Sequence, residues 1–288
     1  MRRAFGNLPL PIARIFSSMT NALRKLFRLA LPYLSLATCI LSAAGAYGTG
    51  KHRPAPSVAP SAAAFDHSAF DRLLKKHVNE KGLVNYKGFR ADAKAFDQYL
   101  AQLSSTPPAA SWSKPEQMAY WINAYNAYTI RLILNHYPVK SIKDIGSRIK
   151  IPFVTTPWAA EFFSIGGQKM SLDNIEHSIL RKKYDDPRIH FALVCASISC
   201  PRLRNEAYTA AKLDSQLDDQ GRDFLNNPTK NNISKTSAQL SRYFDWYKGD
   251  WNESGQSVVK WVNRYANTKM SPDAKITFLD YNWNLNEQ

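Results

Sequence analysis

A stretch of sixteen residues from Asp186 to Pro201 constrains the fold more than any other part of the sequence. Asp186-Pro187 opens the stretch with residues typical of a turn. The run from Ile189 to Ala196 is almost wholly apolar and includes β-branched and aromatic side chains. Such a run is typical of a short strand buried on both faces. The sequence therefore predicts a central strand, which the polar residues after it bring to an end.

Two cysteines lie near the end of this predicted strand. Proline restricts the residue before it to extended backbone, so Pro201 is expected to hold Cys200 at a bend. A side chain at a bend beside a rigid element is a candidate nucleophile, and a structural or disulfide-bonded thiol is the alternative. Cys195, inside the strand, is expected to be an inert core residue. A Cys195–Cys200 disulfide requires the chain to double back, because five extended residues span about 16 Å.

A long helix is predicted from Ser113 to about His136, just before Pro138. Ser113 and Glu116 have the spacing of a capping box, in which each side chain satisfies a backbone N–H of the other. The helix is apolar nearly all round. A helix with this pattern is expected to lie in the middle of the protein.

Asn123 and Asn126 lie within this helix, three residues apart, so their side chains point the same way. A buried amide without partners costs about 1–3 kcal/mol, so both side chains are expected to be hydrogen-bonded. One interpretation is that they bind the backbone of a neighbouring loop. The other is that they line a site, with Asn123 as an oxyanion donor or as the orienter of a histidine, and Asn126 contacting a ligand.

The helix predicted after Ser171, its N-cap, carries a carboxylate on its apolar side. Glu176 lies four residues from both Leu172 and Leu180, so it faces the core. A carboxylate there needs a cation nearby or has a raised pKa. Arg181 and Arg188 are close in sequence, which favours a structural ion pair, and a general acid or base is the alternative.

His177 and His190 are the candidate bases for Cys200. His190 begins the predicted strand, and an extended strand to Ala196 covers about 20 Å, which places its imidazole far from Cys200. His177, on the preceding helix, is an equally good candidate. A metal site from His190, Cys195 and Cys200 has no recognised ligand spacing, so we expect no metal and no cofactor.

The remaining pattern completes the expected architecture. Helices are predicted over residues 65–79, 89–103, 206–227 and 258–265, a hairpin over 162–170 with its turn at Gly166-Gly167, and a last strand over 276–279. The aromatic-rich run over 240–251 is expected to pack in the core. The fold class is α+β: a mainly helical single domain, residues 65–288, with a small mixed or antiparallel sheet.

The first 46 residues are expected to direct export. Arg24, Lys25 and Arg28 precede an apolar run from Leu29 to Ala43, and small residues follow at 44–46. With the small residues that follow, the segment 29–46 is about 18 residues long, which is short for a spanning helix, so a cleaved signal peptide ranks before a membrane anchor at 29–46 and before a lipoprotein. Either Met1 or Met19 is consistent with the start. Residues 47–64, rich in Gly, Pro, Ala and Ser, are expected to form a flexible linker.

The net charge of +15 comes from basic residues dispersed along the chain. An exported protein rarely meets nucleic acid, so none is expected as a partner. Anionic lipid or cell-wall surfaces fit this charge, and an ordinary solvated basic surface is the simpler alternative. The composition leaves the oligomeric state open.

Several motifs together resemble one family, domain of unknown function 547 (DUF547). The resemblance covers residue 66 to the end, and one departure is Asn282, where the family ending is more often acidic. The family carries no established reaction. The resemblance implies a set of motif residues, namely Asn123, Asn126, Glu176, His177, Arg181, His190 and Cys200. The quoted motifs are Tyr120–Ala127, Ile175–Arg181, Asp186–Leu193, Ser199–Pro201, Phe244–Tyr247 and Tyr281–Asn286.

Polar residues in apolar elements beside a thiol suggest, by analogy, a papain-like or transglutaminase-like site. The first hypothesis is an exported thiol-dependent hydrolase or acyl transferase acting on an amide, peptide or thiol-containing substrate. The alternatives are a non-catalytic module that binds a small-molecule or peptide-like ligand or an envelope component in the same pocket, and an envelope scaffold. The roles expected are Cys200 as nucleophile, His177 or His190 as base, Glu176 as orienter or acid, Asn123 as oxyanion donor, and Asn126, Arg181 and Arg188 as ligand contacts.

Overall fold

Helix α5 (Lys114–His136) is the central element, with the bounds that the sequence predicts. The capping box is present: Ser113 N–H donates to Glu116 Oε2 over 2.6 Å, and Ser113 Oγ accepts from the Glu116 N–H. Most side chains from Met118 to Ile133 are buried on every side of the helix. The computed structural model describes residues 64–146 and 156–288, so the expected signal and nearly all of the linker lie outside the described residues.

Among the residues that the structure describes, three helices precede α5: α2 (Ser68–His77), α3 (Tyr86–Ala91) and α4 (Ala93–Ser105). The single helix expected over 89–103 is therefore two helices, which meet at Asp92. Asn85 starts α3 early, because its side chain accepts from the Gly88 N–H over 2.8 Å. Asp92 leaves helical geometry, and its carboxylate binds Lys76 and His77 of α2 instead.

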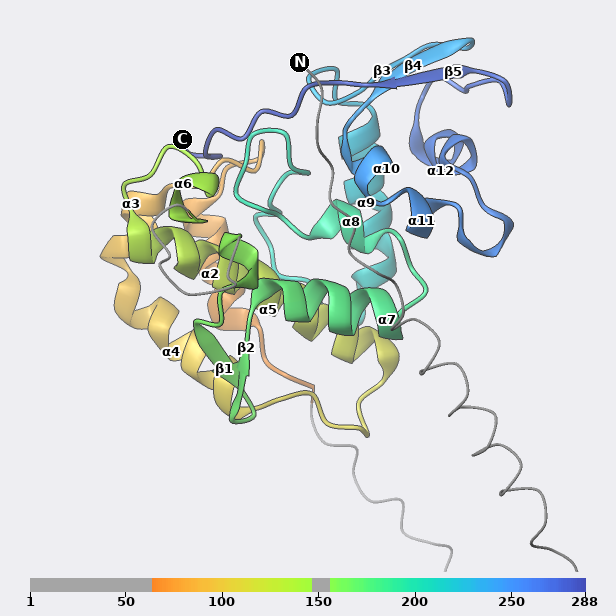
Figure 1. The fold of residues 1–288 in the computed structure, drawn as a ribbon. Coiled ribbons are helices and arrows are strands. Elements are labelled where there is room, and N and C mark those ends of the chain that lie inside the picture. Colours follow the sequence, from red (N-terminus) through yellow and green to blue (C-terminus); the bar gives the residue numbers. More distant parts are fainter. Residues whose placement is uncertain (1–63, 147–155) are drawn as a thin grey trace, which may run out of the picture. The chain divides into compact units, whose positions relative to one another are not determined.

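The described part of the chain also contains two small sheets (Figure 1). Strands β1 (Phe163–Ile165) and β2 (Gln168–Met170) form the expected hairpin, with positive φ at Gly166 and Gly167. Strand β4 (Ser237–Leu240) pairs antiparallel with β3 (Asn232–Ile233) and parallel with β5 (Lys275–Phe278). The expected mainly helical α+β class with a small mixed sheet is confirmed.

The strand predicted over Ile189–Ala196 is wrong. Ile189–Ala192 is helix α8, and the chain leaves it in extended backbone at Leu193. The Asp186-Pro187 turn continues into the helix, because the N–H groups of 189, 190 and 191 donate to the carbonyls of 186, 187 and 188 over 2.9–3.2 Å. The apolar run is buried as expected, and burial on all sides suits a short helix as well as a strand.

Ser171 caps the following helix as expected, with its Oγ accepting from the Asn174 N–H over 3.2 Å. The middle of this helix, η2 (Asn174–Leu180), is wound as a π-helix and continues into α7 (Arg181–Lys183). The Arg181 N–H accordingly donates to the Glu176 carbonyl, five residues back. The helix packs against α5 (Figure 1).

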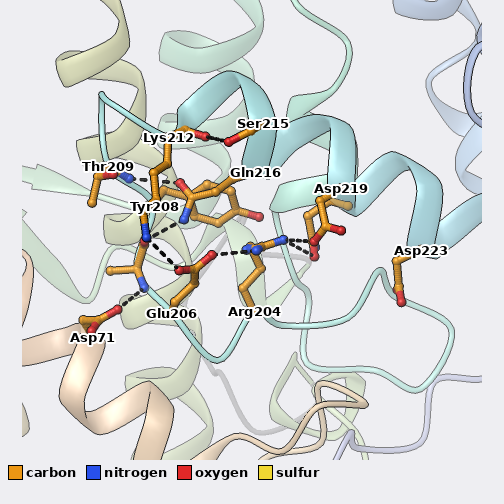
Figure 2. Close-up of polar contacts among 12 residues, drawn as sticks. Asp71, Arg204, Glu206, Tyr208, Thr209, Lys212, Ser215, Gln216, Asp219 and Asp223 are labelled. Carbon is orange, nitrogen blue, oxygen red and sulfur yellow. Dashed lines mark hydrogen bonds and ion pairs between the residues drawn. The ribbon is translucent and has the colours of Figure 1, made fainter.

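Helix α9 (Leu213–Leu225) begins later than the expected residue 206. The backbone before it is held by side chains rather than by helical hydrogen bonds (Figure 2). Gln216 accepts from the Thr209 N–H over 3.1 Å and donates to the Ala207 carbonyl over 2.9 Å. Asp71 of α2 accepts from the Ala207 N–H over 3.0 Å.

The C-terminal part contains α10 (Tyr243–Trp246), α11 (Lys248–Trp251) and α12 (Val258–Tyr265), the last with its predicted bounds. Three short turns of helix complete the list, α6 (Lys143–Gly146), η1 (Pro157–Ala159) and η3 (Glu253–Gly255). Within residues 64–146 and 156–288, no helix combines the length and the apolar character that a membrane crossing requires.

Candidate functional site

A cleft of about 290 Å³ gathers several of the predicted site residues. Its lining comes from α5, from the π-helical segment η2, from α8 and the extended chain after it, and from α10 with the residue that follows. Glu176, His177, His190 and Cys195 all line it. The structure thus brings together residues from five of the quoted motifs, because Tyr125, Trp246 with Tyr247, and Trp283 also line the cleft.

Glu176 is the buried carboxylate of the cleft, with 6 % of its surface exposed. The hydroxyls of Tyr125 and Tyr247 donate hydrogen bonds to it. Burial, and then the charge of Glu176, raises the pKa of both tyrosines well above the usual range, so both keep their protons and remain donors. The prediction that Glu176 faces the core is confirmed. Arg181 and Arg188, which are close to Glu176 in sequence, pair with aspartates instead of with Glu176.

His190 is 1 % exposed and is held in one orientation. Its Nε2 lies 2.8 Å from Oδ2 of Asp250, and its ring stacks on Tyr247 at 3.7 Å between centroids. Burial lowers the pKa of His190, and the bond to Asp250 offsets this only in part. The imidazole is therefore neutral at pH 7, with the Nε2 proton donated to Asp250.

Asp250 joins His190 to Arg181. The guanidinium of Arg181 donates to both carboxylate oxygens, from Nε to Oδ2 over 2.7 Å and from NH2 to Oδ1 over 2.6 Å. Burial would raise the pKa of Asp250, but the hydrogen bonds and charges of Arg181 and His190 together hold it far below the usual range. Asp250 is a positioning residue that the sequence reasoning missed, because it lies sixty positions after His190 in a run interpreted as core.

His177 lies on the rim of the cleft, with 44 % of its side chain exposed. Its Nδ1 accepts from Arg181 over 3.1 Å, and its Nε2 lies 3.7 Å from Asp173. Burial first, and then the charge of Glu176, raises the pKa of Asp173, which also lines the cleft. Two carboxylates therefore face one cavity.

The two predicted asparagines hold backbone rather than line the cleft. Asn123 donates to the Tyr208 carbonyl over 2.8 Å and accepts from the Tyr208 N–H over 2.9 Å. Asn126 donates to the Ala192 carbonyl and accepts from the Val194 N–H, both over 3.0 Å. This matches the first interpretation of the pair. Asn126 fixes the chain where α8 ends and Cys195 approaches.

Cys195 and Cys200 form a disulfide, with their Cα atoms 6.3 Å apart. The chain doubles back as a disulfide requires, because Ala196 takes a left-handed conformation with φ of 59°. Cys195 is buried as expected, and its sulfur is bonded to that of Cys200. Cys200, the predicted nucleophile, is 1 % exposed, and its sulfur is bonded to Cys195. The helix in place of the predicted strand also removes the reason for a 20 Å separation between His190 and Cys200, because a helix rises only about 1.5 Å per residue.

Arg188 lies apart from this cleft. Its guanidinium donates to Asp186 over 2.7 Å and to Asp218 over 2.8 Å, and it pairs with Asp214 over 2.7 Å. It lines a different cavity, beside Lys114 and Tyr184. Among the described residues, no group of three or more His, Cys, Asp or Glu side chains is placed to hold a metal ion.

Tryptophans from three segments also line the cleft. Trp246 and Trp283 stack at 5.7 Å between centroids, and Trp158 lies 5.8 Å from Trp283. Trp246 keeps 46 % of its surface exposed. These side chains were expected in the core or were not singled out. The clustering of aromatic residues over 240–251 indicated that this segment is important, but it did not distinguish residues that pack in the core from residues that line a cleft.

Comparison with protein families identifies part of this architecture. Residues 109–225 match the model of the family described as "Protein of unknown function, DUF547". The matched segment contains α5, η2, α8 and the two cysteines, and it ends before Asp250 and the tryptophans at 246 and 283. No curated protein and no solved structure matches the chain. The likeness to papain-like or transglutaminase-like proteins stays a prediction.

Proposed function

We propose that this chain, which belongs to the DUF547 family through residues 109–225, binds a small organic cation in the cleft. One observation carries the proposal: the buried carboxylate of Glu176 lies in a cavity whose other walls are largely aromatic. This is the non-catalytic alternative that the sequence left open, with the class of ligand added.

The charges of the cleft favour a cation. Glu176 and Asp173 both line it, whereas burial keeps His190 neutral at pH 7. The guanidinium of Arg181, which contacts His177 of the lining, is bound to both oxygens of Asp250 and so is already compensated. A positively charged ligand therefore meets a carboxylate held by two tyrosine hydroxyls in a poorly solvated space, where Coulomb attraction is strong.

The aromatic lining favours a cation that carries methyl groups. Tyr247, Trp246 and Trp283 all line the cavity, and the rings of Trp246 and Trp283 stack on each other. A cation near a ring face gains about 0.5–2 kcal/mol, and quaternary ammonium ligands are commonly bound by several such rings. The volume of about 290 Å³ limits the ligand to a small molecule.

The experiment compares choline with its uncharged isostere 3,3-dimethylbutan-1-ol by tryptophan fluorescence titration of the full chain. We expect choline to bind at least tenfold more tightly, and Glu176→Gln to weaken choline binding about tenfold without changing the binding of the alcohol. Glu161→Gln, an exposed site away from the cleft, is the control and should bind like wild type. Equal affinity for the two ligands would refute the proposal.

A thiol-dependent hydrolase or acyl transferase is the second candidate. One observation favours it: His190 and Cys195 line the same cleft. The reaction requires reduced cysteines, because the sulfur of the predicted nucleophile Cys200 is bonded to Cys195. Release of p-nitrophenol from p-nitrophenyl acetate by the reduced chain, lost in Cys200→Ser, would support it. No difference between the reduced wild type and that variant would exclude Cys200 as the nucleophile.

We retain export as part of the proposal, on the basic, apolar and small-residue pattern of the first 46 residues. Export places the cysteines where disulfides persist. N-terminal sequencing of the chain recovered from fractionated cells tests it. Cleavage near residue 46 would support a signal peptide, and an intact N-terminus in the membrane fraction would favour the anchor at 29–46.

A further inference from the structure

The two sulfurs of the disulfide differ in their surroundings. Cys195 lines the cleft and is 8 % exposed, whereas Cys200 is 1 % exposed and is not among the described residues that form the lining. A molecule in the cleft therefore reaches the disulfide at the sulfur of Cys195. The sulfur of Cys200 is buried on the side of Cys195 that faces away from the cleft.

The sulfur of Cys200 is surrounded by hydrogen-bond donors. The backbone N–H of Cys195 lies 2.9 Å from it, and the hydroxyls of Tyr243 and Tyr281 each lie 3.3 Å away. The hydroxyl of Ser197 lies at 3.4 Å. The hydroxyls of Ser197 and Tyr281 also lie 3.2 and 3.3 Å from the sulfur of Cys195. The groups that favour Cys200 over Cys195 are therefore the Cys195 N–H and the hydroxyl of Tyr243, which is 3.8 Å from the sulfur of Cys195. Burial raises the pKa of both tyrosines far above the usual range, so these hydroxyls keep the protons that they donate. Such an arrangement stabilises a negative charge more than a neutral sulfur.

A cation adds to this field. Lys230 is 9 % exposed, and its Nζ donates to the carbonyl oxygen of Cys200. Burial lowers the pKa of Lys230 to about 8, so its amine is mostly protonated at pH 7. A positive charge and hydrogen-bond donors are the features that lower the pKa of a cysteine thiol. A thiol of low pKa is also the better leaving group in disulfide exchange.

We propose that the cleft is a thiol–disulfide exchange site for small thiols, with Cys195 as the sulfur attacked and Cys200 as the leaving thiolate. The inference goes beyond ligand binding and does not depend on the charge of the ligand. The attacking thiol reacts as its thiolate, after loss of its proton to solvent or to the neutral His190, which lines the same cleft.

The electrons and atoms balance over two steps. In the first, the sulfur of the small thiolate bonds to Cys195 Sγ, the Cys195–Cys200 bond breaks, and its electron pair stays on Cys200. In the second, another small thiolate attacks the small-molecule sulfur of the mixed disulfide and releases Cys195 as a thiolate. Two small thiols are oxidised to one disulfide, and the cysteine pair is reduced. The reverse sequence oxidises the pair with a small disulfide.

The first test asks which cysteine forms the mixed disulfide. The full chain is prepared with Cys39→Ser, and either Cys200→Ser or Cys195→Ser is added, so that one cysteine remains. Each protein is treated with cystamine and followed by intact-mass spectrometry. We expect the chain that retains Cys195 to be modified at least about tenfold faster, because access controls the reaction. Equal rates, or faster modification of Cys200, would overturn the proposal.

The second test asks whether the donors stabilise the leaving group. We measure the rate at which cysteamine reduces the disulfide of the folded Cys39→Ser chain. This rate is divided by the reduction rate of the same chain unfolded in guanidinium chloride, so that the ratio reports the effect of the folded surroundings. We expect Tyr243→Phe and Tyr281→Phe each to lower this ratio about tenfold, the size expected for loss of a hydrogen bond to a charged group. Tyr184→Phe removes a hydroxyl that donates to Gln117, so it is the matched control.

Near-UV circular dichroism confirms that each variant is folded. If either tyrosine variant is unfolded, Ser197→Ala takes its place and is expected to lower the ratio about threefold. Ratios equal to that of Tyr184→Phe in the folded variants would overturn the role of Cys200 as the leaving group. This result would leave the binding of choline unaffected, so the failure of this inference and the failure of the proposed function are distinguishable.

Discussion

Nε2 of His190 donates to Oδ2 of Asp250 across 2.8 Å, and the same oxygen accepts from Nε of Arg181 at 2.7 Å. The carboxylate of Asp250 therefore holds the ring of a buried histidine and neutralises the guanidinium of Arg181. His190 lies in α8 and Asp250 in α11, sixty residues later in the chain. The orientation of His190 in the cleft depends on this long-range contact.

Asp250→Asn should destabilise the chain, because it leaves the Arg181 guanidinium without its counter-ion. Loss of one partner from a fully buried pair costs about 3–5 kcal/mol, and the partial exposure of Asp250 lowers our expectation to about 2 kcal/mol. Urea unfolding followed by tryptophan fluorescence measures the change. Asp245→Asn, whose carboxylate pairs with Arg242 at the surface, should cost less than about 0.5 kcal/mol. A similar loss in both variants would contradict the structural role of Asp250.

Patterns within one element were predictable from the sequence, and contacts between distant segments were not. The capping box gave α5 its bounds, and the four-residue spacing placed Glu176 on the buried side. The apolar run over 189–196 did not reveal its secondary structure, because a short buried helix and a buried strand share that pattern. Asp250 carried no local signal. Its role depends on where α11 packs, which no spacing within the motif of His190 encodes.

A change in pH tests the buried histidines. Burial lowers the pKa of His67 to about 4, from a usual value of about 6.5. The unfolded chain therefore binds a proton between pH 6.5 and 4 that the folded chain does not, so the free energy of unfolding falls with decreasing pH in this window. The slope is at most about 1.4 kcal/mol per pH unit for each such group. His190, with its pKa also lowered, adds to the same slope.

His67→Gln should make the pH dependence shallower without abolishing it. Urea unfolding at intervals between pH 7 and pH 4 gives the slope for wild type and variant. Asn267→Gln changes an exposed side chain that does not titrate and serves as the control, with the wild-type slope expected. An unchanged slope in His67→Gln would show that this histidine does not contribute.

Reduction of the Cys195–Cys200 disulfide should lower stability by about 2 kcal/mol, the loop-closure entropy expected for so short a loop. Urea unfolding with and without tris(2-carboxyethyl)phosphine measures the effect. The Cys195→Ser/Cys200→Ser variant supplies the control, because the reductant should not change its stability. A wild-type chain insensitive to the reductant would contradict a stabilising disulfide.

Asn126→Ala should disturb the cleft indirectly, because Asn126 holds the backbone next to the cleft rather than lining it. The side chain of Asn126 bridges the Ala192 carbonyl and the Val194 N–H, so its removal leaves two buried backbone groups without partners. Each costs about 1–3 kcal/mol, and we expect a loss of about 3 kcal/mol in unfolding free energy. Because the bridge fixes the chain that leads to Cys195, choline binding should weaken as well.

Asn126→Asp separates the two hydrogen bonds of this bridge. An aspartate still accepts from the Val194 N–H, but its second oxygen faces the Ala192 carbonyl oxygen and its charge is buried, so at pH 7 its stability should fall below that of the alanine variant. Asn267→Ala, at an exposed position, controls for the loss of an amide and should change neither quantity. If the alanine variant bound choline like wild type while losing stability, the bridge would support the fold alone. If stability were also unchanged, the hydrogen bonds of Asn126 would not hold the end of α8 in place.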